Sequence, residues 1–166
     1  MSQIVAWTQW SDLKVPAGVT LHSPTDFPLE ASDLSKINFY VPSYMGGKAA
    51  LDWAAQMPNL KVLQMPNAGY DDALAYLRPG LILCNASGVH DASTAELAVT
   101  LALSSRRGIP DFVRDQDKEN WNHHRLTSLS DSKIGIVGYG SIGKQIAKNL
   151  SGFEVEVIGF SKSGRD

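Results

Sequence analysis

Residues 133–147 read KIGIVGYGSIGKQIA, and this stretch decides the fold. Its first residues are mostly apolar and predict a strand in the interior of a sheet, ending at Val137. The glycine-rich turn Gly138–Gly143 follows, and the residues after it have the spacing of an amphipathic helix. A second apolar run at 155–160, VEVIGF, predicts a neighbouring parallel strand. The stretch therefore predicts a strand–helix–strand unit.

The three glycines of this turn have the spacing G-x-G-x-x-G. Gly138 permits a tight turn, Gly140 lets the backbone approach a pyrophosphate, and Gly143 lets the helix pack close to the strand. The N–H groups at the start of the helix point at the phosphates. The alternative is a purely structural turn, but the strand before it and the helix after it favour a dinucleotide site. The predicted cofactor-binding residues in the turn are Gly138, Tyr139, Gly140, Ser141, Ile142 and Gly143.

The end of the second strand bears on the choice between NAD and NADP. In NAD sites an acidic residue, about 20 residues after the turn, binds the ribose hydroxyls. No acidic residue stands there in this chain, and Ser161, Lys162 and Arg165 take its place. Hydroxyls and cations suit a 2′-phosphate, so the sequence favours NADP over NAD. The alternative is that these residues are a solvated tail.

Composition excludes several classes of function. The chain has 166 residues, a formal net charge of −2 and scattered Lys and Arg, which argues against nucleic acid or membrane as a partner. Its start resembles no signal peptide, and a cytoplasmic location is expected. The single cysteine, Cys84, is expected to be buried in a strand and allows neither a disulfide framework nor a zinc cluster. We expect no metal site.

The first ninety or so positions alternate short strands with short helices, a pattern typical of a parallel α/β sheet. Pro and Gly separate the elements. The predicted strands are 3–8, 19–22, 37–41, 61–64 and 81–84, and the predicted helices are 48–56 and 71–77.

The longest predicted helix runs over about 94–106. Ser93 and Glu96 have the spacing of a capping box that would start it. Leu97 and Leu101, with Ala98 and Ala102, are expected to form its inward-facing stripe. The residues from 111 to 131 are polar and predict a linker to the glycine-turn unit.

Three segments together resemble the D-isomer-specific 2-hydroxyacid dehydrogenases. They are 62–72 (VLQMPNAGYDD), 85–103 (NASGVHDASTAELAVTLAL) and 133–147, and Trp121 matches a tryptophan of the family. The resemblance implies a flavodoxin-like parallel-sheet substrate domain followed by the first β–α–β unit of a Rossmann domain. The implied divisions are a substrate domain at 1–93, an interdomain helix and linker at 94–131, and an NAD(P)-binding domain at 132–166.

The resemblance also implies an activity, which is hydride transfer between NAD(P)H and C2 of a small 2-oxo or 2-hydroxy acid. Thr94 matches a position near the nicotinamide. The long helix matches the region through which family members pair as homodimers. In the family, one loop offers backbone N–H groups to the substrate carboxylate, and another lies at the mouth of the cleft. The matching residues are Ala68, Gly69 and Tyr70 for the first loop, and Met45 and Gly46 for the second.

No catalytic residue is expected among these 166 positions. The family's arginine, glutamate and acid–base histidine lie downstream of the second nucleotide-domain strand, and none of the four histidines here matches the catalytic position. These histidines are His22, His90, His123 and His124. The resemblance therefore implies a truncated N-terminal half of the enzyme, inactive alone. The alternative is a non-catalytic dimerisation or nucleotide-binding module derived from the family.

Overall fold

A computed structural model describes residues 3–162 of the chain. The backbone divides into two compact units, Met1–Val89 and His90–Asp166. The sequence-based boundary at 93 lies four residues further along, inside the first turn of the long helix. No helix within the described range is long and apolar enough to cross a lipid bilayer.

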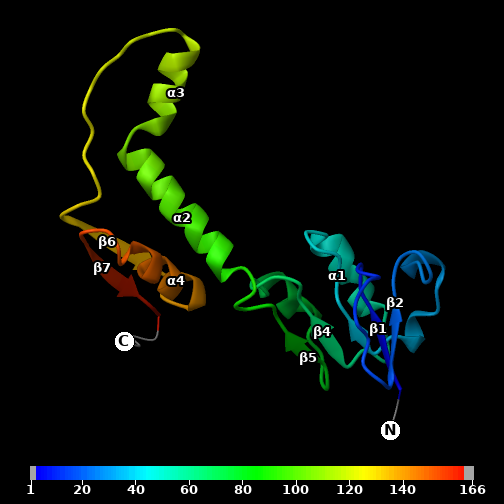
Figure 1. Cartoon of the computed structure of the whole chain (residues 1–166). Coiled ribbons are helices and arrows are strands. Elements are labelled where there is room, and N and C mark those ends of the chain that lie inside the picture. The colour runs from blue at the N-terminus through cyan, green and yellow to red at the C-terminus, as the bar shows by residue number, and fades with distance from the viewer. Residues whose placement is uncertain (1–2, 163–166) are drawn as a thin grey trace. The chain divides into compact units, whose positions relative to one another are not determined.

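The first unit is built on a five-stranded parallel sheet (Figure 1). Its order is β2-β1-β3-β4-β5, the flavodoxin-like order, in which chain direction across the sheet reverses between β1 and β3. The predicted flavodoxin-like parallel sheet is thus confirmed. The strands are β1 (Ile4–Trp7), β2 (Val19–His22), β3 (Phe39–Tyr40), β4 (Val62–Gln64) and β5 (Ile82–Cys84).

Helices of the first unit are short. The predicted helix at 48–56 is α1 (Gly47–Ala55), and the one at 71–77 is the 3-10 helix η3 (Asp71–Tyr76). Two further 3-10 turns, η1 (Leu29–Ala31) and η2 (Leu34–Lys36), lie between β2 and β3 and were not predicted. Their three-residue length gives no helical periodicity for a sequence to display.

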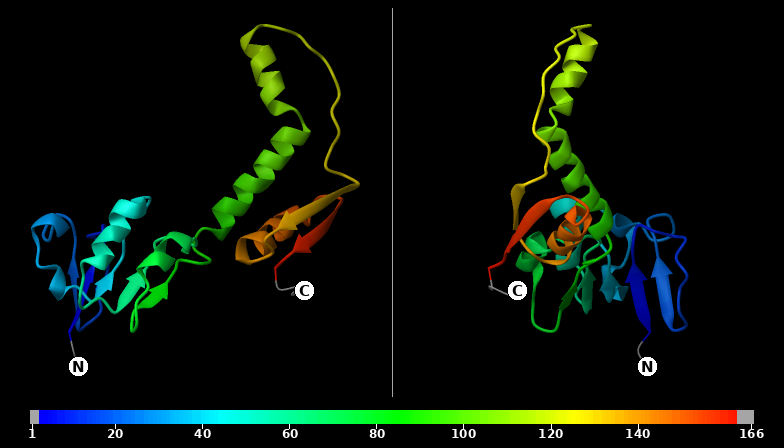
Figure 2. Two further views of the ribbon diagram at one scale, coloured as in Figure 1. Left: turned by 180° about the vertical axis from the view of Figure 1, so that it is seen from behind. Right: turned by 60° about the vertical axis from the view of Figure 1, so that its left-hand side comes forward.

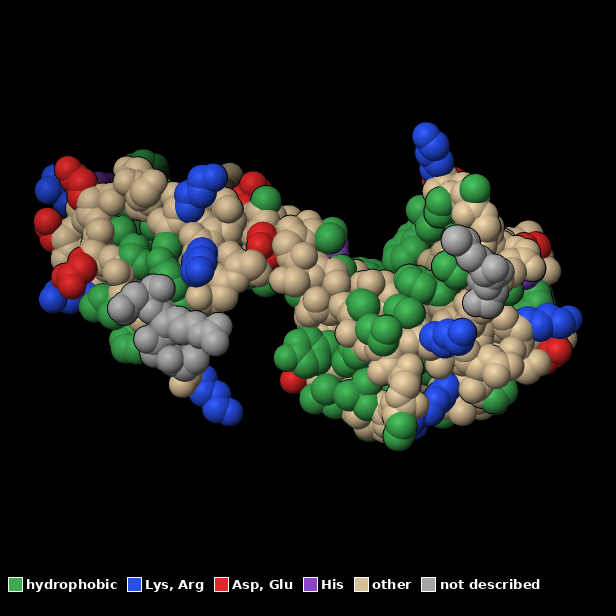
Figure 3. Space-filling view, turned by 90° about the horizontal axis from the view of Figure 1, so that it is seen from below, with side chains coloured by type: hydrophobic (Ala, Val, Ile, Leu, Met, Phe, Trp, Pro, Cys, Tyr) green, Lys and Arg blue, Asp and Glu red, His purple; other side chains and the backbone are tan. Residues whose placement is uncertain are grey.

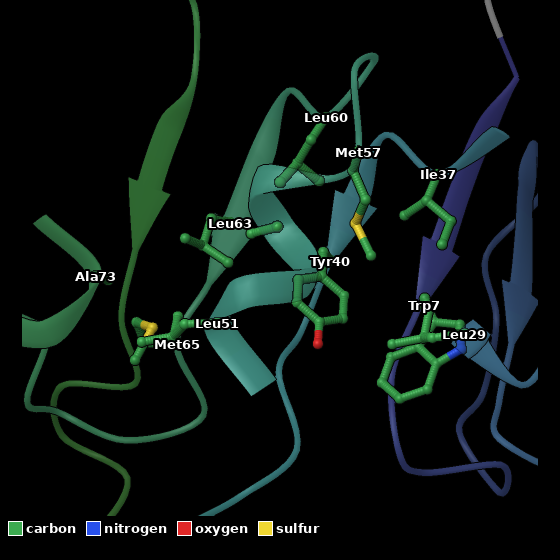
Figure 4. Packing of buried hydrophobic residues seen from close by; sticks show 11 residues of the cluster. Trp7, Leu29, Ile37, Tyr40, Leu51, Met57, Leu60, Leu63, Met65 and Ala73 are labelled. Atoms are coloured by element: carbon green, nitrogen blue, oxygen red, sulfur yellow. The ribbon is translucent and has the colours of Figure 1, made fainter. Parts of the chain in front are cut away.

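The core of the first unit lies between the sheet and α1 (Figure 4). The rings of Trp7 and Tyr40 lie 5.5 Å apart in a tilted arrangement. The buried Tyr40 hydroxyl donates a hydrogen bond of 2.7 Å to the carbonyl of Ala50, and this burial raises the pKa of Tyr40. Tyr40 thereby attaches β3 to α1. The cluster consists of Trp7, Leu29, Ile37, Tyr40, Leu51, Ala54, Met57, Leu60, Leu63, Met65 and Ala73.

The second unit contains the predicted strand–helix–strand arrangement. Strands β6 (Ser132–Val137) and β7 (Val155–Phe160) pair in parallel, and α4 (Ser141–Leu150) connects them. Helix α2 (Asp91–Arg106) packs against α4, and α3 (Ile109–Asp117) follows α2 (Figure 2). The first β–α–β unit of a Rossmann domain is therefore confirmed.

The start of α2 corrects the capping-box prediction. The helix begins at Asp91, with His90 as its N-terminal capping residue, so Ser93 lies inside the first turn. The Ser93 hydroxyl donates to the carbonyl of His90 at 3.2 Å instead of capping a later N–H group. Asp91 supplies the negative charge that the positive end of the helix favours.

The predicted inward-facing stripe of α2 is also wrong. Leu97 and Leu101 are 58% and 60% exposed, whereas Ala95 is fully buried. The helix therefore turns a face with a small side chain inward. Small residues let helices approach closely, and amphipathic spacing alone cannot distinguish that face from the leucine face.

Three other predictions also fail, on the linker, Val137 and Cys84. Helix α3 (Ile109–Asp117) occupies the start of the linker predicted at 111–131. Gly108 before it has a φ of 61°, and Pro110 lies in the first turn of α3, where its missing N–H costs nothing. Val137 is 90% exposed, because one face of the two-stranded sheet is left uncovered by α4. Cys84 is only partly buried. Figure 3 shows that hydrophobic side chains reach the surface of both units.

Leu63 and Ile82 allow a matched test of the first unit's core. Leu63 is fully buried in β4, and Ile82 on the neighbouring β5 is 59% exposed. We expect Leu63→Ala to lower the free energy of unfolding by about 2–5 kcal/mol, because it leaves a cavity, and Ile82→Ala by less than about 1 kcal/mol. Urea unfolding followed by tryptophan fluorescence, which reports on buried Trp7, measures both. Equal losses for the two variants would contradict this core.

Candidate functional site

The glycine turn between β6 and α4 is built on a close backbone contact. Gly138 has a φ of 98°, a conformation that side chains disfavour. A Cβ atom placed on Gly143 would lie only 2.3 Å from the carbonyl oxygen of Gly138. The strand end and the first turn of the helix therefore touch backbone to backbone, and only glycine at 143 permits this.

The turn is open to solvent at Gly140. A Cβ atom on Gly140 would meet nothing within 4 Å, and its φ of −85° suits any residue. The N–H groups of Ser141, Ile142 and Gly143 belong to the first turn of α4, where no intrahelical acceptor exists. That turn contains no acidic side chain. Such a combination of free donors, a positive helix end and open space can hold a diphosphate.

Backbone hydrogen bonds attach this turn to the end of β7. The carbonyl of Phe160 accepts from the N–H groups of Gly138 and Tyr139, at 2.9 and 3.2 Å. Ser161 and Lys162 follow directly and are exposed. The structure therefore holds the proposed 2′-phosphate residues next to the turn, whereas Arg165 lies outside the described residues.

Helix α2 begins beside the same turn. The hydroxyl of Ser141, the first residue of α4, lies 3.3 Å from Oδ1 of Asp91, the first residue of α2. Thr94 stands in the first turn of α2 and is exposed. The contact between Asp91 and Ser141 thus brings the helix end that carries Thr94 to the glycine turn.

In the first unit, the expected substrate loops leave adjacent parallel strands at the same sheet edge. Met45 and Gly46 follow β3; Met45 has a φ of 59° and is 82% exposed. A Cβ atom on Gly46 would lie 2.6 Å from the Cβ of Ala50, so the loop joins α1 without room for a side chain. The N–H of Tyr44 donates to the side chain of Gln9, which links the loop to the end of β1.

The loop after β4 contains Ala68, Gly69 and Tyr70. Its carbonyl at Ala68 accepts from the Asn85 side chain at 2.8 Å, and the carbonyl of Asn67 accepts from the Ala86 N–H at 3.0 Å. Within the described residues, the N–H groups of Ala68, Gly69 and Tyr70 donate no hydrogen bond. They remain available to a carboxylate at the rim of the sheet.

Sequence reasoning missed the residues that hold these loops in place, which are Gln9, Asn85 and Asp91. Each acts through one side-chain hydrogen bond to a segment distant in sequence, from 17 to 50 residues away. No local motif signals such a contact. Asn67 also carries a buried side-chain oxygen with no partner in the described part of the chain.

Three of the four histidines have local structural contacts. His22 approaches Asp26 at 3.4 Å, and His124 stacks on Phe112 with ring centroids 4.7 Å apart. His90 is the N-terminal capping residue of α2. Among the residues that the structure describes, no group of three or more His, Cys, Asp and Glu side chains is placed to hold a metal ion.

Comparison with known proteins identifies the class of this fold. Residues 99–166 match the model of the D-isomer specific 2-hydroxyacid dehydrogenase, NAD binding domain. The chain is 33% identical over 117 residues to a glyoxylate reductase of Thermococcus litoralis, covering 64% of this chain and 35% of that protein. It is 29% identical over 119 residues to a D-3-phosphoglycerate dehydrogenase of Methanocaldococcus jannaschii, covering 69% and 23%.

Solved structures agree with this class. An NADPH-dependent glyoxylate/hydroxypyruvate reductase from Sinorhizobium meliloti, in complex with NADP and sulfate, superimposes with a TM-score of 0.72 and 27% identity. The match covers 90% of this chain and 47% of that one. A D-isomer specific 2-hydroxyacid dehydrogenase family protein from Aeromonas salmonicida has the same fold, with a TM-score of 0.78, 23% identity, and coverage of 99% and 56%.

This chain is therefore similar to the D-isomer-specific 2-hydroxyacid dehydrogenases, and the resemblance seen in its motifs is confirmed. Its second unit contains the first β–α–β unit of a nicotinamide-dinucleotide-binding domain of the kind that this family model describes. The chain spans about half the length of the solved proteins and a smaller share of the curated relatives.

Two glycine substitutions separate packing from ligand access in the turn. We expect Gly143→Ala to lower the free energy of unfolding of the second unit by about 1–3 kcal/mol, because its new methyl group overlaps the Gly138 carbonyl. Gly140→Ala adds the same methyl group in open space and should leave stability unchanged or slightly raised. Urea unfolding followed by circular dichroism measures both, and wild-type stability of Gly143→Ala would contradict the close contact.

Proposed function

We propose that this chain binds NADP or NAD at the turn between β6 and α4 and a small 2-oxo or 2-hydroxy acid at the loops of its first unit. These are the two binding functions of an NAD(P)-dependent D-2-hydroxyacid dehydrogenase. The observation that carries the proposal is the backbone contact of Gly143 with Gly138, beside the open space at Gly140. This contact directs the first N–H groups of α4 out of the turn, where a diphosphate fits.

A preference for NADP is supported by the charge after β7. Ser161 and Lys162 take the place where an NAD site has an acidic residue. A 2′-phosphate carries about two negative charges near neutral pH, whereas the ribose hydroxyls of NAD carry none. Lys162 would therefore favour NADP without affecting the diphosphate contacts.

A carboxylate-binding role for the first unit is supported by the donors on the loop after β4. The N–H groups of Ala68, Gly69 and Tyr70 are available at the carboxyl edge of the sheet, where ligands bind in open α/β folds. A glyoxylate or hydroxypyruvate carboxylate would accept from them. Met45 and Gly46, on the next loop along the edge, would border the same ligand.

We propose binding without turnover for these 166 residues. Hydride transfer to a 2-oxo acid needs a proton donor for the substrate oxygen and a cation for the carboxylate. The resemblance assigns neither role to a residue of this chain. NADPH oxidation with glyoxylate or hydroxypyruvate should stay at background, and robust turnover by the isolated chain would contradict this part of the proposal.

The cytoplasmic location expected from the sequence stays a prediction.

Calorimetric titration tests the cofactor site. We expect NADP to bind more tightly than NAD, and Lys162→Ala to weaken NADP binding by about five- to tenfold while leaving NAD binding unchanged, since only NADP carries the 2′-phosphate. Lys148→Ala, at the other end of α4, removes the same charge from an exposed position and is the control. Equal effects of the two substitutions would contradict the assignment of Lys162.

Pairing of two chains through α2 is the second candidate function. The exposed side chains of Leu97 and Leu101 are four residues apart and lie on one face of the helix. Adjacent exposed leucines mark an interaction surface. The resemblance also implies pairing through this helix, with or without catalysis, so a homodimer is the expected partner.

Light scattering after gel filtration tests the pairing. We expect a dimer for the wild-type chain and a monomer for Leu101→Asp, because a buried unpaired carboxylate is costly. Ala92→Asp adds the same charge at an exposed position on the opposite side of α2, two and a half turns away, and should remain dimeric. A monomeric wild-type chain would rule out this candidate.

A further inference from the structure

The contact between Asp91 and Ser141 joins two helix ends at the glycine turn. Asp91 Oδ1 lies 3.3 Å from Ser141 Oγ, and each residue is the first of its helix, α2 or α4. The N-terminal end of a helix carries a partial positive charge. The N-terminal ends of α2 and α4 therefore lie side by side here, and the carboxylate of Asp91 is next to both of them.

We propose that Asp91 acts as a built-in anion that competes with the cofactor diphosphate and so sets the affinity of the site. The proposal rests on the proposed function, because the diphosphate is expected at the N–H groups of Ser141, Ile142 and Gly143. A diphosphate bound there lies within a few ångströms of the Asp91 carboxylate, and two anions at that distance repel each other. The Ser141 hydroxyl also has to leave Asp91 before it can donate to a phosphate oxygen.

Asp91 is not required to build the turn itself. The turn is held by the contact of Gly143 with Gly138 and by the hydrogen bonds of Gly138 and Tyr139 to the Phe160 carbonyl. Asn at position 91 keeps an oxygen that can accept from Ser141 and removes only the charge. Asp91→Asn therefore separates the electrostatic role of Asp91 from its role as a hydrogen-bond acceptor.

The test is calorimetric titration of the wild-type and Asp91→Asn chains with four ligands. Asp91→Asn should bind NADP, NAD and ADP-ribose about five- to tenfold more tightly, and the gain should shrink at high salt, because screening weakens like-charge repulsion. 2′-AMP carries no diphosphate and should bind both chains equally. Glu96→Gln removes an exposed carboxylate from α2, more than one turn further along, and should change binding less than about twofold.

The outcomes separate this inference from the proposed function. Binding of NADP by the wild type with equal or weaker binding by Asp91→Asn overturns the role of Asp91 and leaves the proposed site standing. A gain for 2′-AMP as large as that for NADP also overturns it, because the effect would then not depend on the diphosphate. Failure of both chains to bind any diphosphate ligand overturns both proposals.

Discussion

The second unit of this molecule depends on the direct backbone contact between Gly143 and the carbonyl of Gly138. Because no side chain separates them, α4 begins immediately beside the end of β6. In this position, the unpaired N–H groups of the first helical turn point beyond the edge of the sheet. The same geometry leaves Gly140 with open space in front of it. A bulkier residue at 143 would move the helix and remove the donors from the site.

A comparable constraint arranges the loops of the first unit. In a parallel sheet the carboxyl ends of all strands meet at one edge, so the loops after β3 and β4 lie side by side without any special sequence. Contacts distant in sequence then fix them, from Gln9 to the Tyr44 N–H and from Asn85 to the Ala68 carbonyl. Tyr40 fixes the helix that follows by its bond to Ala50. Strand order brings these loops to one edge, and a few side-chain contacts hold them in place.

The sequence predicts those features that depend on local spacing. The seven strands found within residues 3–162 and the turn at 138–143 were predicted from apolar runs and from Gly and Pro, because these patterns reflect the backbone itself. The inward face of α2 could not be predicted in this way. Leu97 and Leu101 have the larger side chains, but Ala95 is the residue that is buried. Which face turns inward depends on the neighbouring helix, and one helix alone carries no information about it.

The start of α2 and the existence of α3 show the limit of motif reading. Ser93 and Glu96 fit a capping box, but Asp91 provides an equally suitable negative charge two residues earlier, and the helix begins there. Residues 109–117 are polar enough to suggest a linker, yet Pro110 follows Gly108 at a position typical of a helix start. In the candidate site, the glycine turn can be predicted from the spacing of its residues. The contact between Asp91 and Ser141 joins residues 50 positions apart, so only the folded structure reveals it.

The most direct measurement is a nuclear magnetic resonance titration of the ¹⁵N-labelled chain with NADP. We expect the largest shifts of amide signals at Ser141, Ile142 and Gly143, followed by Ser161 and Lys162, because these groups would meet the diphosphate and the 2′-phosphate. If saturating NADP leaves those amides unmoved, or shifts only amides elsewhere in the chain, the dinucleotide site assigned to this turn is wrong.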